Sequence, residues 1–359
     1  MKSPPVYQRL LDLPALLRRR SHFLLGPRST GKTFLIRRRL PAAKVYDLLD
    51  SDVYARLTRR PRTLGEELSD WEGPVVIDEI QKLPALLDEV HRLIEARGLR
   101  FLLTGSSARK LRRGGVNLLG GRAREARLFP LCSREIPEFD LTAYLNRGGI
   151  PRIHASQDFK AELQGYTGLY LSQEIMAEAL VRKVGNFARF MDIAALQCGE
   201  ELNFEGLAGD CGVPARTVQS YVSILEDTLV GFQVPSFRAT RKRKAITRAK
   251  FFFFDIGVVN ALAQRGEIKA RSELFGRCFE HFLFLELRAY LGYSRLAHPL
   301  QYWRSTSGFE VDCVVGDRLA LEFKSSDAVS ERHLRGLKAL REEGKVGGYA
   351  VVSLDTAPR

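Results

Sequence analysis

The segment from Phe23 to Ile36 constrains the fold of this chain more than any other part of the sequence. Phe23–Leu25 form an apolar run, Gly26–Thr33 is rich in glycine and hydroxyl residues, and apolar residues typical of a helix follow. In such a loop, glycines allow several backbone N–H groups and the helix N-terminus to face an anion. The order of strand, loop and helix therefore predicts a phosphate-binding site rather than an ordinary glycine-rich turn.

Two side chains of this loop have the chemistry that a bound nucleotide requires. Lys32 can reach the β- and γ-phosphates, and the hydroxyl of Thr33 can ligate magnesium. ATP and Mg2+ are therefore the expected cofactors. The loop residues predicted to bind the nucleotide are Gly26, Pro27, Arg28, Ser29, Thr30, Gly31, Lys32 and Thr33.

A second apolar run, Pro74–Ile77, leads directly into the acidic pair Asp78-Glu79. Beside a phosphate-binding loop, Asp78 is expected to hold magnesium and Glu79 to orient the attacking water. A surface acidic pair is the alternative, but surfaces do not usually place one directly after four apolar strand residues. A third apolar run ends near Thr104 and Ser106, where a parallel sheet faces its ligand. Either hydroxyl could contact the γ-phosphate.

An arginine follows the third strand, in Gly121-Arg122. Its guanidinium could neutralise transition-state charge in the site of a neighbouring subunit. We therefore expect Lys32, Glu79 and Arg122 to be catalytic in ATP hydrolysis, and the chain to form a ring or a dimer. A DNA contact or a surface role is the alternative for Arg122.

The charge balance favours a polyanionic partner. The net charge is +14 and the pI is about 9.7, more than a nucleotide needs, so DNA is the expected partner. Basic runs lie at 18–20, 37–39, 109–127 and 241–244, although each alone could be a solvated surface.

The five cysteines match no zinc or disulfide spacing, which fits a reducing cytoplasm. No apolar run reaches the roughly 18 residues that cross a membrane, so no membrane partner is expected.

Two regions of helical character follow the first module. Periodicity over 129–184 predicts a helical lid, and 204–226 carries a helix-turn-helix pattern. Runs at 234–237 and 251–254 are then typical of the two strands of a wing, around a tip at 238–250 with seven basic residues and no acidic one. This predicts a winged helix on the DNA backbone; packing on its own ATPase core as an interaction module is the alternative. The residues predicted to bind DNA are Arg216, Gln219, Arg241, Lys242, Arg243 and Lys244.

The C-terminal region brings together acidic residues and a lysine. A helix is expected over 274–291, carrying Glu280, and two strands over 309–315 and 319–324. A three-residue loop would pair Val315 with Leu319 and thus Asp312 with Glu322. Lys324 lies on the same face. A helix at 331–343 and a strand at 349–354 complete the order.

These residues resemble the core of PD-(D/E)xK nucleases. The resemblance implies that Asp312 and Glu322 hold magnesium, that Lys324 positions water, and that Glu280 approaches from the helix. A structural ion cluster is the alternative, because folds are often retained after their chemistry is lost.

Taken together, the motifs resemble those of bacterial and archaeal AAA+ ATPases with a P-loop module, a winged helix and a C-terminal nuclease-like domain of unknown function. The resemblance covers nearly the whole chain. It implies an α/β fold with a P-loop AAA+ parallel sheet, a helical lid, a winged helix and a C-terminal α/β domain like that of restriction endonucleases. The expected domains are the ATPase core 1–128, the lid 129–185, the winged helix 186–260 and the nuclease-like domain 261–359. The segments that carry the resemblance besides the winged-helix and C-terminal regions are Leu25–Arg28, Ile77–Gln81, Leu103–Ser106, Gly121-Arg122 and Gly148–Pro151.

The expected function is that of an AAA+ ATPase that hydrolyses ATP with Mg2+ and couples turnover to the binding or remodelling of DNA, branched DNA included. Nuclease activity of the C-terminal domain is left open. The alternative is a nucleotide-gated regulatory or interaction switch that neither moves along DNA nor cuts it.

Overall fold

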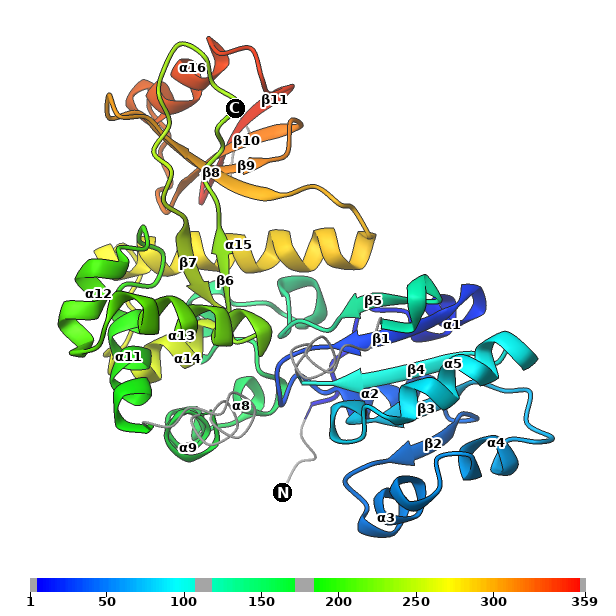
Figure 1. Cartoon of the computed structure of the whole chain (residues 1–359). Helices are drawn as coiled ribbons and strands as arrows, with labels where there is room; N and C mark the ends of the chain where they lie inside the picture. The colour runs from blue at the N-terminus through cyan, green and yellow to red at the C-terminus, as the bar shows by residue number, and fades with distance from the viewer. Residues whose placement is uncertain (1–4, 107–117, 172–183, 356–359) are drawn as a thin grey trace. The chain divides into compact units, whose positions relative to one another are not determined.

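The computed structural model describes residues 5–106, 118–171 and 184–355 (Figure 1). The first part of the basic stretch 109–127, up to 117, and the last part of the predicted lid, 172–183, lie outside these residues. The chain falls into two compact units. The first contains 1–137, 150–152 and 227–229, and the second contains 138–149, 153–226 and 230–359.

The first unit is built on a five-stranded parallel sheet with the strand order β2-β3-β4-β1-β5 (Figure 1). Every residue of the three central strands is buried, as expected for a parallel sheet that helices cover on both faces. The strands are β1 Ser21–Leu25, β2 Lys44–Asp47, β3 Val75–Asp78, β4 Phe101–Gly105 and β5 Ala123–Arg127. The helices are α1 Leu13–Arg19, α2 Lys32–Arg39, α3 Ser51–Arg59, α4 Thr63–Glu67 and α5 Leu86–Arg97, with short 3-10 turns η1 Ile80–Lys82, η2 Leu118–Gly121 and η3 Ser133–Glu135.

The second unit begins with helices and continues into two small sheets. A two-stranded antiparallel ribbon, β6–β7, follows the helix-turn-helix segment. The helices, of which α8 and α13 extend to residues of the first unit, are α7 Leu141–Arg147, α8 Pro151–Ala155, α9 Phe159–Gly165, η4 Tyr166–Leu171, α11 Val184–Leu196, α12 Phe204–Cys211, α13 Ala215–Asp227 and α14 Ile256–Leu262. The ribbon strands are β6 Gly231–Val234 and β7 Lys250–Phe253.

A four-stranded mixed sheet with the order β11-β10-β9-β8 forms the C-terminal part, and α15 and α16 pack against it (Figure 1). Phe284 of α15 contacts Phe323 of β10, with ring centroids 5.7 Å apart, while Leu337 and Leu340 of α16 join the buried cluster around Val311 and Val314. The elements are α15 Glu273–Ser294, β8 Leu300–Arg304, β9 Glu310–Val315, β10 Leu319–Lys324, η5 Glu331–Leu334, α16 Arg335–Arg341 and β11 Gly348–Ser353.

The fold class predicted from the sequence is therefore confirmed: an α/β chain with a P-loop-type parallel sheet, a helical region and a separate C-terminal mixed sheet. The predicted hairpin register is confirmed for three pairs, from Leu319↔Val315 to Leu321↔Cys313. Gly316 makes the short loop feasible, since its φ of 55° lies in the left-handed region that glycine adopts at little cost.

The strand after the helix-turn-helix differs from the prediction. We expected 234–237, but β6 covers Gly231–Val234, in register with β7 from Gly231↔Phe253 to Val234↔Lys250. Pro235 follows at once, and proline has no N–H to donate to a ladder. The next residues pair with β8 instead, a strand that the sequence analysis missed. Ser236 bridges Tyr302, and Phe237 N donates to Tyr302 O at 2.7 Å.

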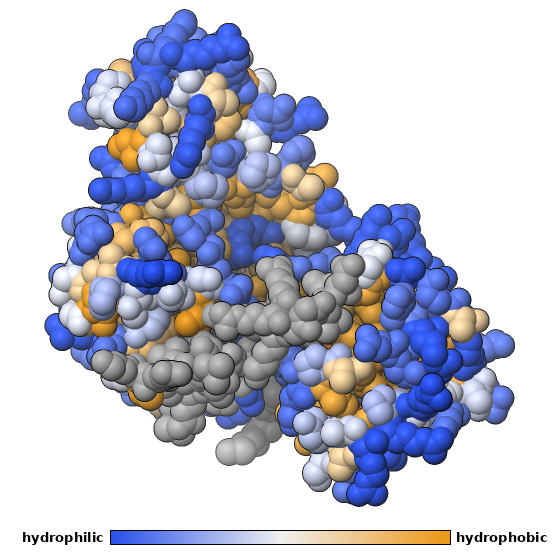
Figure 2. Space-filling model, viewed as in Figure 1, coloured by the Kyte–Doolittle hydropathy of each residue, from blue (hydrophilic) through white to orange (hydrophobic). Residues whose placement is uncertain are grey.

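Among the described residues, no helix is both long and apolar enough to span a membrane. The longest of the described helices, α15, carries charged side chains among its 22 residues, at Glu273, Arg277, Glu280, Glu286 and Arg288. On the face of the molecule in Figure 2, hydrophilic residues dominate the coloured surface, and hydrophobic ones form small patches.

Candidate functional site

The phosphate-binding loop connects β1 to α2. Gly31, at φ 90°, is the N-cap of α2, so the helix begins at Lys32 and its N-terminus faces the loop. Thr30 Oγ1 donates to Pro27 O at 2.8 Å and holds the turn closed. The side chain of Lys32 is buried, and its Nζ donates to Gly26 O at 2.7 Å and to Pro27 O at 3.2 Å. The ammonium thus lies inside the loop that the sequence predicts to hold phosphates.

Asp78 lies at the end of β3, next to this loop, and hydroxyl groups hold both of its carboxylate oxygens. Thr33 Oγ1 donates to Oδ2 at 2.8 Å, and Thr104 Oγ1 donates to Oδ1. Hard oxygen donors of this kind are the ligands that Mg2+ prefers. The structure therefore brings together the predicted magnesium ligands Thr33 and Asp78. Thr104 is fully buried and also accepts from Glu79 N at 3.1 Å, so here it positions the acidic pair.

Glu79 directly follows β3 in a left-handed conformation, with φ 60° and ψ 43°. Burial raises the pKa of its carboxyl above the ordinary value, although Lys32 and a hydrogen bond from Gln81 act in the opposite direction. Gln81 Nε2 donates to Glu79 Oε2 and lies 3.3 Å from Ser106 Oγ. Gln81 therefore connects the predicted base to the predicted γ-phosphate contact. The sequence analysis gave it no role, although its place two residues after Glu79 was a usable signal.

Arg9 is a second residue that sequence reasoning missed. It lies before the first helix and is buried. Its Nη1 donates to Thr30 O at 2.7 Å, its Nη2 donates to Phe129 O, and its Nε lies 3.0 Å from Glu135 Oε1. Glu135, fully buried, also accepts from Leu10 N and Cys132 N. These contacts fix the phosphate-binding loop to the segment that follows β5. The local sequence around Arg9 contains no pattern that predicts them.

Arg28 and Ser29 are exposed on the loop. Arg122 is half-exposed, and its Nε donates to Glu95 Oε1 on α5. The predicted action of Arg122 on a neighbouring subunit stays a prediction.

The predicted DNA-binding residues divide into two groups. On α13, Arg216 and Gln219 are exposed, while Val218 and Tyr221 are buried as the helical spacing predicts. In the tip after β6, the backbone N–H groups of Arg241 and Lys242 donate to Glu343 Oε2 at 2.7 and 2.9 Å. Of the four residues predicted to bind DNA there, Arg241, Lys242 and Lys244 have exposed side chains.

Arg243 differs from its neighbours in the tip. Its guanidinium donates to Glu342 Oε2 at 2.6 Å and to Ala339 O at 3.1 Å, and it lies 5.2 Å from the ring centroid of Phe309. The residues that follow β6 thus form a loop fixed to the C-terminal sheet, and Arg243 is engaged within the chain.

The C-terminal constellation contains the four predicted residues and two more. Lys324 Nζ lies 2.7 Å from Glu322 Oε1 and 3.9 Å from Asp312 Oδ2. Asp312 Oδ2 also accepts from Phe323 N at 2.7 Å, where the paired ladder has ended. Asp312, Glu322 and Lys324 therefore converge as predicted.

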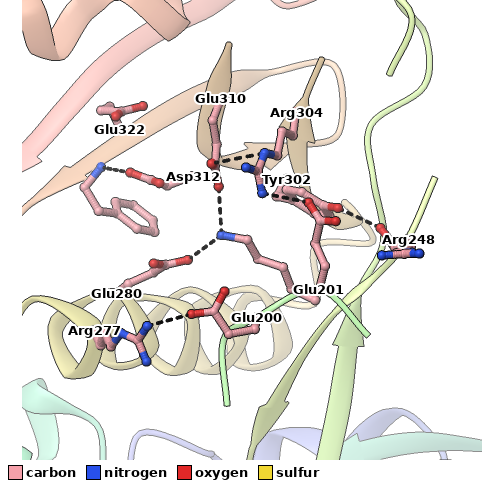
Figure 3. Close-up of polar contacts among 12 residues, drawn as sticks. Glu200, Glu201, Arg248, Arg277, Glu280, Tyr302, Arg304, Glu310, Asp312 and Glu322 are labelled. Atoms are coloured by element: carbon pink, nitrogen blue, oxygen red, sulfur yellow. Dashed lines mark hydrogen bonds and ion pairs between the residues drawn. The ribbon is translucent and has the colours of Figure 1, made fainter. Parts of the chain in front are cut away.

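Glu280 does not contact Lys324 directly. It pairs instead with Lys250 of β7, whose Nζ lies 3.0 Å from Glu280 Oε1 and 3.1 Å from Glu310 Oε1 (Figure 3). Glu310 stands two residues before Asp312 in β9, a spacing that could have drawn attention to it. Lys250 was counted among the basic residues of the wing tip, but its side chain is buried.

The electrostatics of this constellation follow from burial and mutual charge. Burial raises the pKa of Glu280 and of Glu322 to about 7 in each case, and it also raises the pKa of Asp312. Burial alone would lower the pKa of Lys250, but the carboxylates of Glu280, Glu310 and Asp312 outweigh it and raise that pKa. Within the described part of the chain, no three acidic, histidine or cysteine side chains are arranged to hold a metal ion.

The P-loop, the parallel sheet and the Asp78-Glu79 pair define a nucleotide-binding module of the P-loop ATPase class. A family model described as an AAA domain matches residues 18–137, so this module is an AAA-type ATPase domain. Two further models match, each a domain of unknown function: DUF8612 over 138–269 and DUF4143 over 275–357.

No curated protein matches the chain. Among solved structures, the chain is similar to the Orc1 protein of Aeropyrum pernix, solved in complex with DNA, with 14% identity and a TM-score of 0.30. The match covers 71% of this chain and 94% of that one. A likeness of this size does not define a shared function.

Proposed function

We propose that this protein hydrolyses ATP with Mg2+ and couples the hydrolysis to the binding or remodelling of DNA. The observation that carries the ATPase proposal is the arrangement at the carboxyl end of β3. Both oxygens of Asp78 are held by the hydroxyls of Thr33 and Thr104, beside the loop that contains Lys32. Residues of this kind in this order are those that phosphoryl transfer requires.

Each residue has a distinct role in the proposed hydrolysis. Thr33 and Asp78 would hold Mg2+, which supplies charge neutralisation on the phosphates. Lys32 exchanges its contacts with the loop carbonyls for contacts with the β- and γ-phosphates. Glu79 takes the proton of the attacking water, and its burial-raised pKa makes the carboxylate a better proton acceptor at neutral pH. Gln81 orients Glu79 and brings Ser106 toward the γ-phosphate.

The proposal of DNA as a partner rests on charge. The net charge of +14 and the exposed Arg216, Arg241, Lys242 and Lys244 favour a nucleic-acid backbone. We also propose that Arg122 acts in trans within a ring or dimer. The cytoplasm is the proposed location, in keeping with five buried cysteines that form no disulfide within the described residues. A winged helix over 186–260 and a nuclease-like fold over 261–359 remain part of the proposal.

The decisive experiment measures the ATPase rate of the full chain against single-stranded, duplex and branched DNA. Stimulation by one of these, absent in Glu79→Gln, supports coupling to DNA. ATP hydrolysis that no DNA changes would reject the coupling while leaving the ATPase in place. Absence of any hydrolysis under all conditions would reject the ATPase itself.

One observation favours a second candidate, a nucleotide-gated regulatory or interaction switch. The loop after β6 is held by Glu343 and pairs with β8. A loop packed on its own chain in this way suits an interaction module better than a wing that projects onto DNA. For such a switch, binding of ATP without hydrolysis should suffice for its effect, so Glu79→Gln would keep the function that Lys32→Ala loses.

A further inference from the structure

The carboxylates of the C-terminal constellation come from three elements and meet at lysines. Glu280 is on α15, Glu310 and Asp312 are on β9, and Glu322 is on β10. A nuclease of the PD-(D/E)xK type would bind a divalent metal ion with such carboxylates, because oxygen ligands at about 2 Å neutralise their mutual repulsion. The residues as arranged do not fit that ion. Lysine ammonium groups occupy the contacts that it would make.

Lys250 contacts two carboxylates and an aromatic ring. Of its three N–H donors, one faces Glu280 Oε1 at 3.0 Å and another Glu310 Oε1 at 3.1 Å. The Nζ also lies 5.3 Å from the ring centroid of Tyr302, over the face of the ring. In Figure 3, dashed lines run from the carboxylates of Glu280 and Glu310 to the same amine nitrogen.

The backbone that carries Lys250 is fixed on both sides. It pairs with Val234 of β6 and bridges Glu201. Leu202 N donates to Ala249 O at 2.7 Å, and Tyr302 Oη donates to Arg248 O at 2.7 Å. Lys250 is therefore not a surface side chain that happens to reach an acidic patch. Strand β7 holds its side chain in a buried position.

We propose that Lys250 replaces the metal ion in this constellation, so that the carboxylates join β7 to the C-terminal sheet and do not form a metal-dependent nuclease centre. Lys324 lies beside the other two carboxylates, 2.7 Å from Glu322 and 3.9 Å from Asp312, so each lysine serves one pair of acidic groups. Loss of Lys250 leaves Glu280 without its buried counter-charge and leaves Glu310 with Arg304 alone, whose Nε lies 3.8 Å from Glu310 Oε2. The position that the ammonium leaves is bordered by the carboxylates of Glu280 and Glu310, and carboxylate oxygens are ligands that divalent cations prefer.

The test is titration of the nucleotide-free full chain with Mn2+, followed by calorimetry and by thermal unfolding. An Asp78→Asn background removes the predicted metal site of the ATPase module. In that background the chain with Lys250 should show no Mn2+ binding at millimolar concentration and no rise in Tm. Lys250→Met should have a lower Tm in EDTA, and Mn2+ should restore part of the loss.

Two matched variants separate metal binding from general instability. Lys250→Met with Glu310→Ala should lose the response to Mn2+, because a ligand is missing. Lys250→Met with Glu280→Gln replaces the ion pair by two neutral groups, so it should fold without metal and respond weakly. Mn2+ binding by the chain that retains Lys250, abolished by Asp312→Ala, would overturn the proposal. So would a folded Lys250→Met chain that binds no Mn2+.

Discussion

Two neighbouring carboxylates, Asp78 and Glu79, have different surroundings because the backbone turns between them. Asp78 ends a strand and is fixed by two hydroxyls. Glu79 adopts a left-handed conformation, which costs a non-glycine residue about 1 kcal/mol or more and is usually found where function requires it. The turn directs the Glu79 side chain toward Gln81 and away from the two hydroxyls that hold Asp78. Asp78 is therefore placed to hold magnesium, and Glu79 to act as the base.

Gln81→Ala should therefore alter catalysis more than binding. The hydrogen bond from Gln81 lowers the pKa of Glu79, against the larger raising effect of burial. Without it that pKa rises further. Because the base acts only when it is deprotonated, the acidic limb of the kcat profile should move to higher pH, while ATP affinity stays within about twofold. Steady-state ATPase rates between pH 5 and 9 would show this, with exposed Lys82→Ala as the control. An unmoved acidic limb would contradict the role of Gln81.

Glu79→Gln is the companion change at the same site. It should bind ATP as the parent does but hydrolyse it roughly 10²–10⁴-fold more slowly, the usual contribution of a general base. Lys32→Ala should instead lose ATP affinity. Filter binding and phosphate release measure the two properties separately, and full turnover by Glu79→Gln would refute its role as the base.

Arg9 and Glu135 form a buried ion pair whose disruption should be costly. Arg9→Met leaves the fully buried carboxylate of Glu135 without its cation, and breaking such a pair typically costs about 3–5 kcal/mol. The exposed pair Arg60–Glu66 offers a control, because Arg60→Met should cost less than about 1 kcal/mol. Urea unfolding compares the two. Equal losses would mean that Arg9 contributes no more than a surface charge.

At the scale of elements, the sequence predicted those helices, strands and turns that local residue patterns determine. The hairpin of β9 and β10 followed from a short loop and alternating residues, and the loop between β1 and α2 followed from glycine spacing. The start of β6 and the existence of β8 did not follow. Phe237 is buried in the cluster of the C-terminal sheet with Trp303 and Leu340, a contact between segments far apart in the chain. The sequence analysis counted Lys250 among the basic residues of the wing tip for the same reason. Its buried position follows only from contacts with Glu280 and Glu310, which lie far away in the chain.

The loop after β6 should affect DNA binding and stability through different residues. Replacing Arg241, Lys242 and Lys244 together by Ala should weaken DNA binding about equally for all sequences. It should also lower the salt slope by up to about three, near one for each lost phosphate contact. Arg243→Ala should leave the slope unchanged and lower the Tm, because its contacts are with Glu342 and Ala339. Fluorescence anisotropy over a salt series distinguishes them. A slope that changes only in Arg243→Ala would reverse this assignment.

At the scale of the whole molecule, hydrolysis should depend on assembly if Arg122 acts in trans. In the chain itself Arg122 contacts Glu95 near the surface, where a neighbouring subunit could compete for it. Arg122→Ala and Glu79→Gln chains should each be inactive, yet a mixture should recover part of the activity, because one supplies the arginine and the other the base. The rate per chain should also rise with protein concentration. Full activity of a strictly monomeric protein would refute this.

The pairing of β8 with the loop after β6 affects how the chain could have evolved. β8 is the last strand of its sheet, and an uncovered edge of this kind invites pairing with other chains. Here the edge is covered by Ser236 and Ala245, which bridge Tyr302 and Ser305. A shuffling event that cut between the ribbon and α15 would deliver a C-terminal sheet with an open, sticky border. The loop after β6 therefore protects the edge of the C-terminal sheet, and a chain cut between the ribbon and α15 is expected to self-associate through β8.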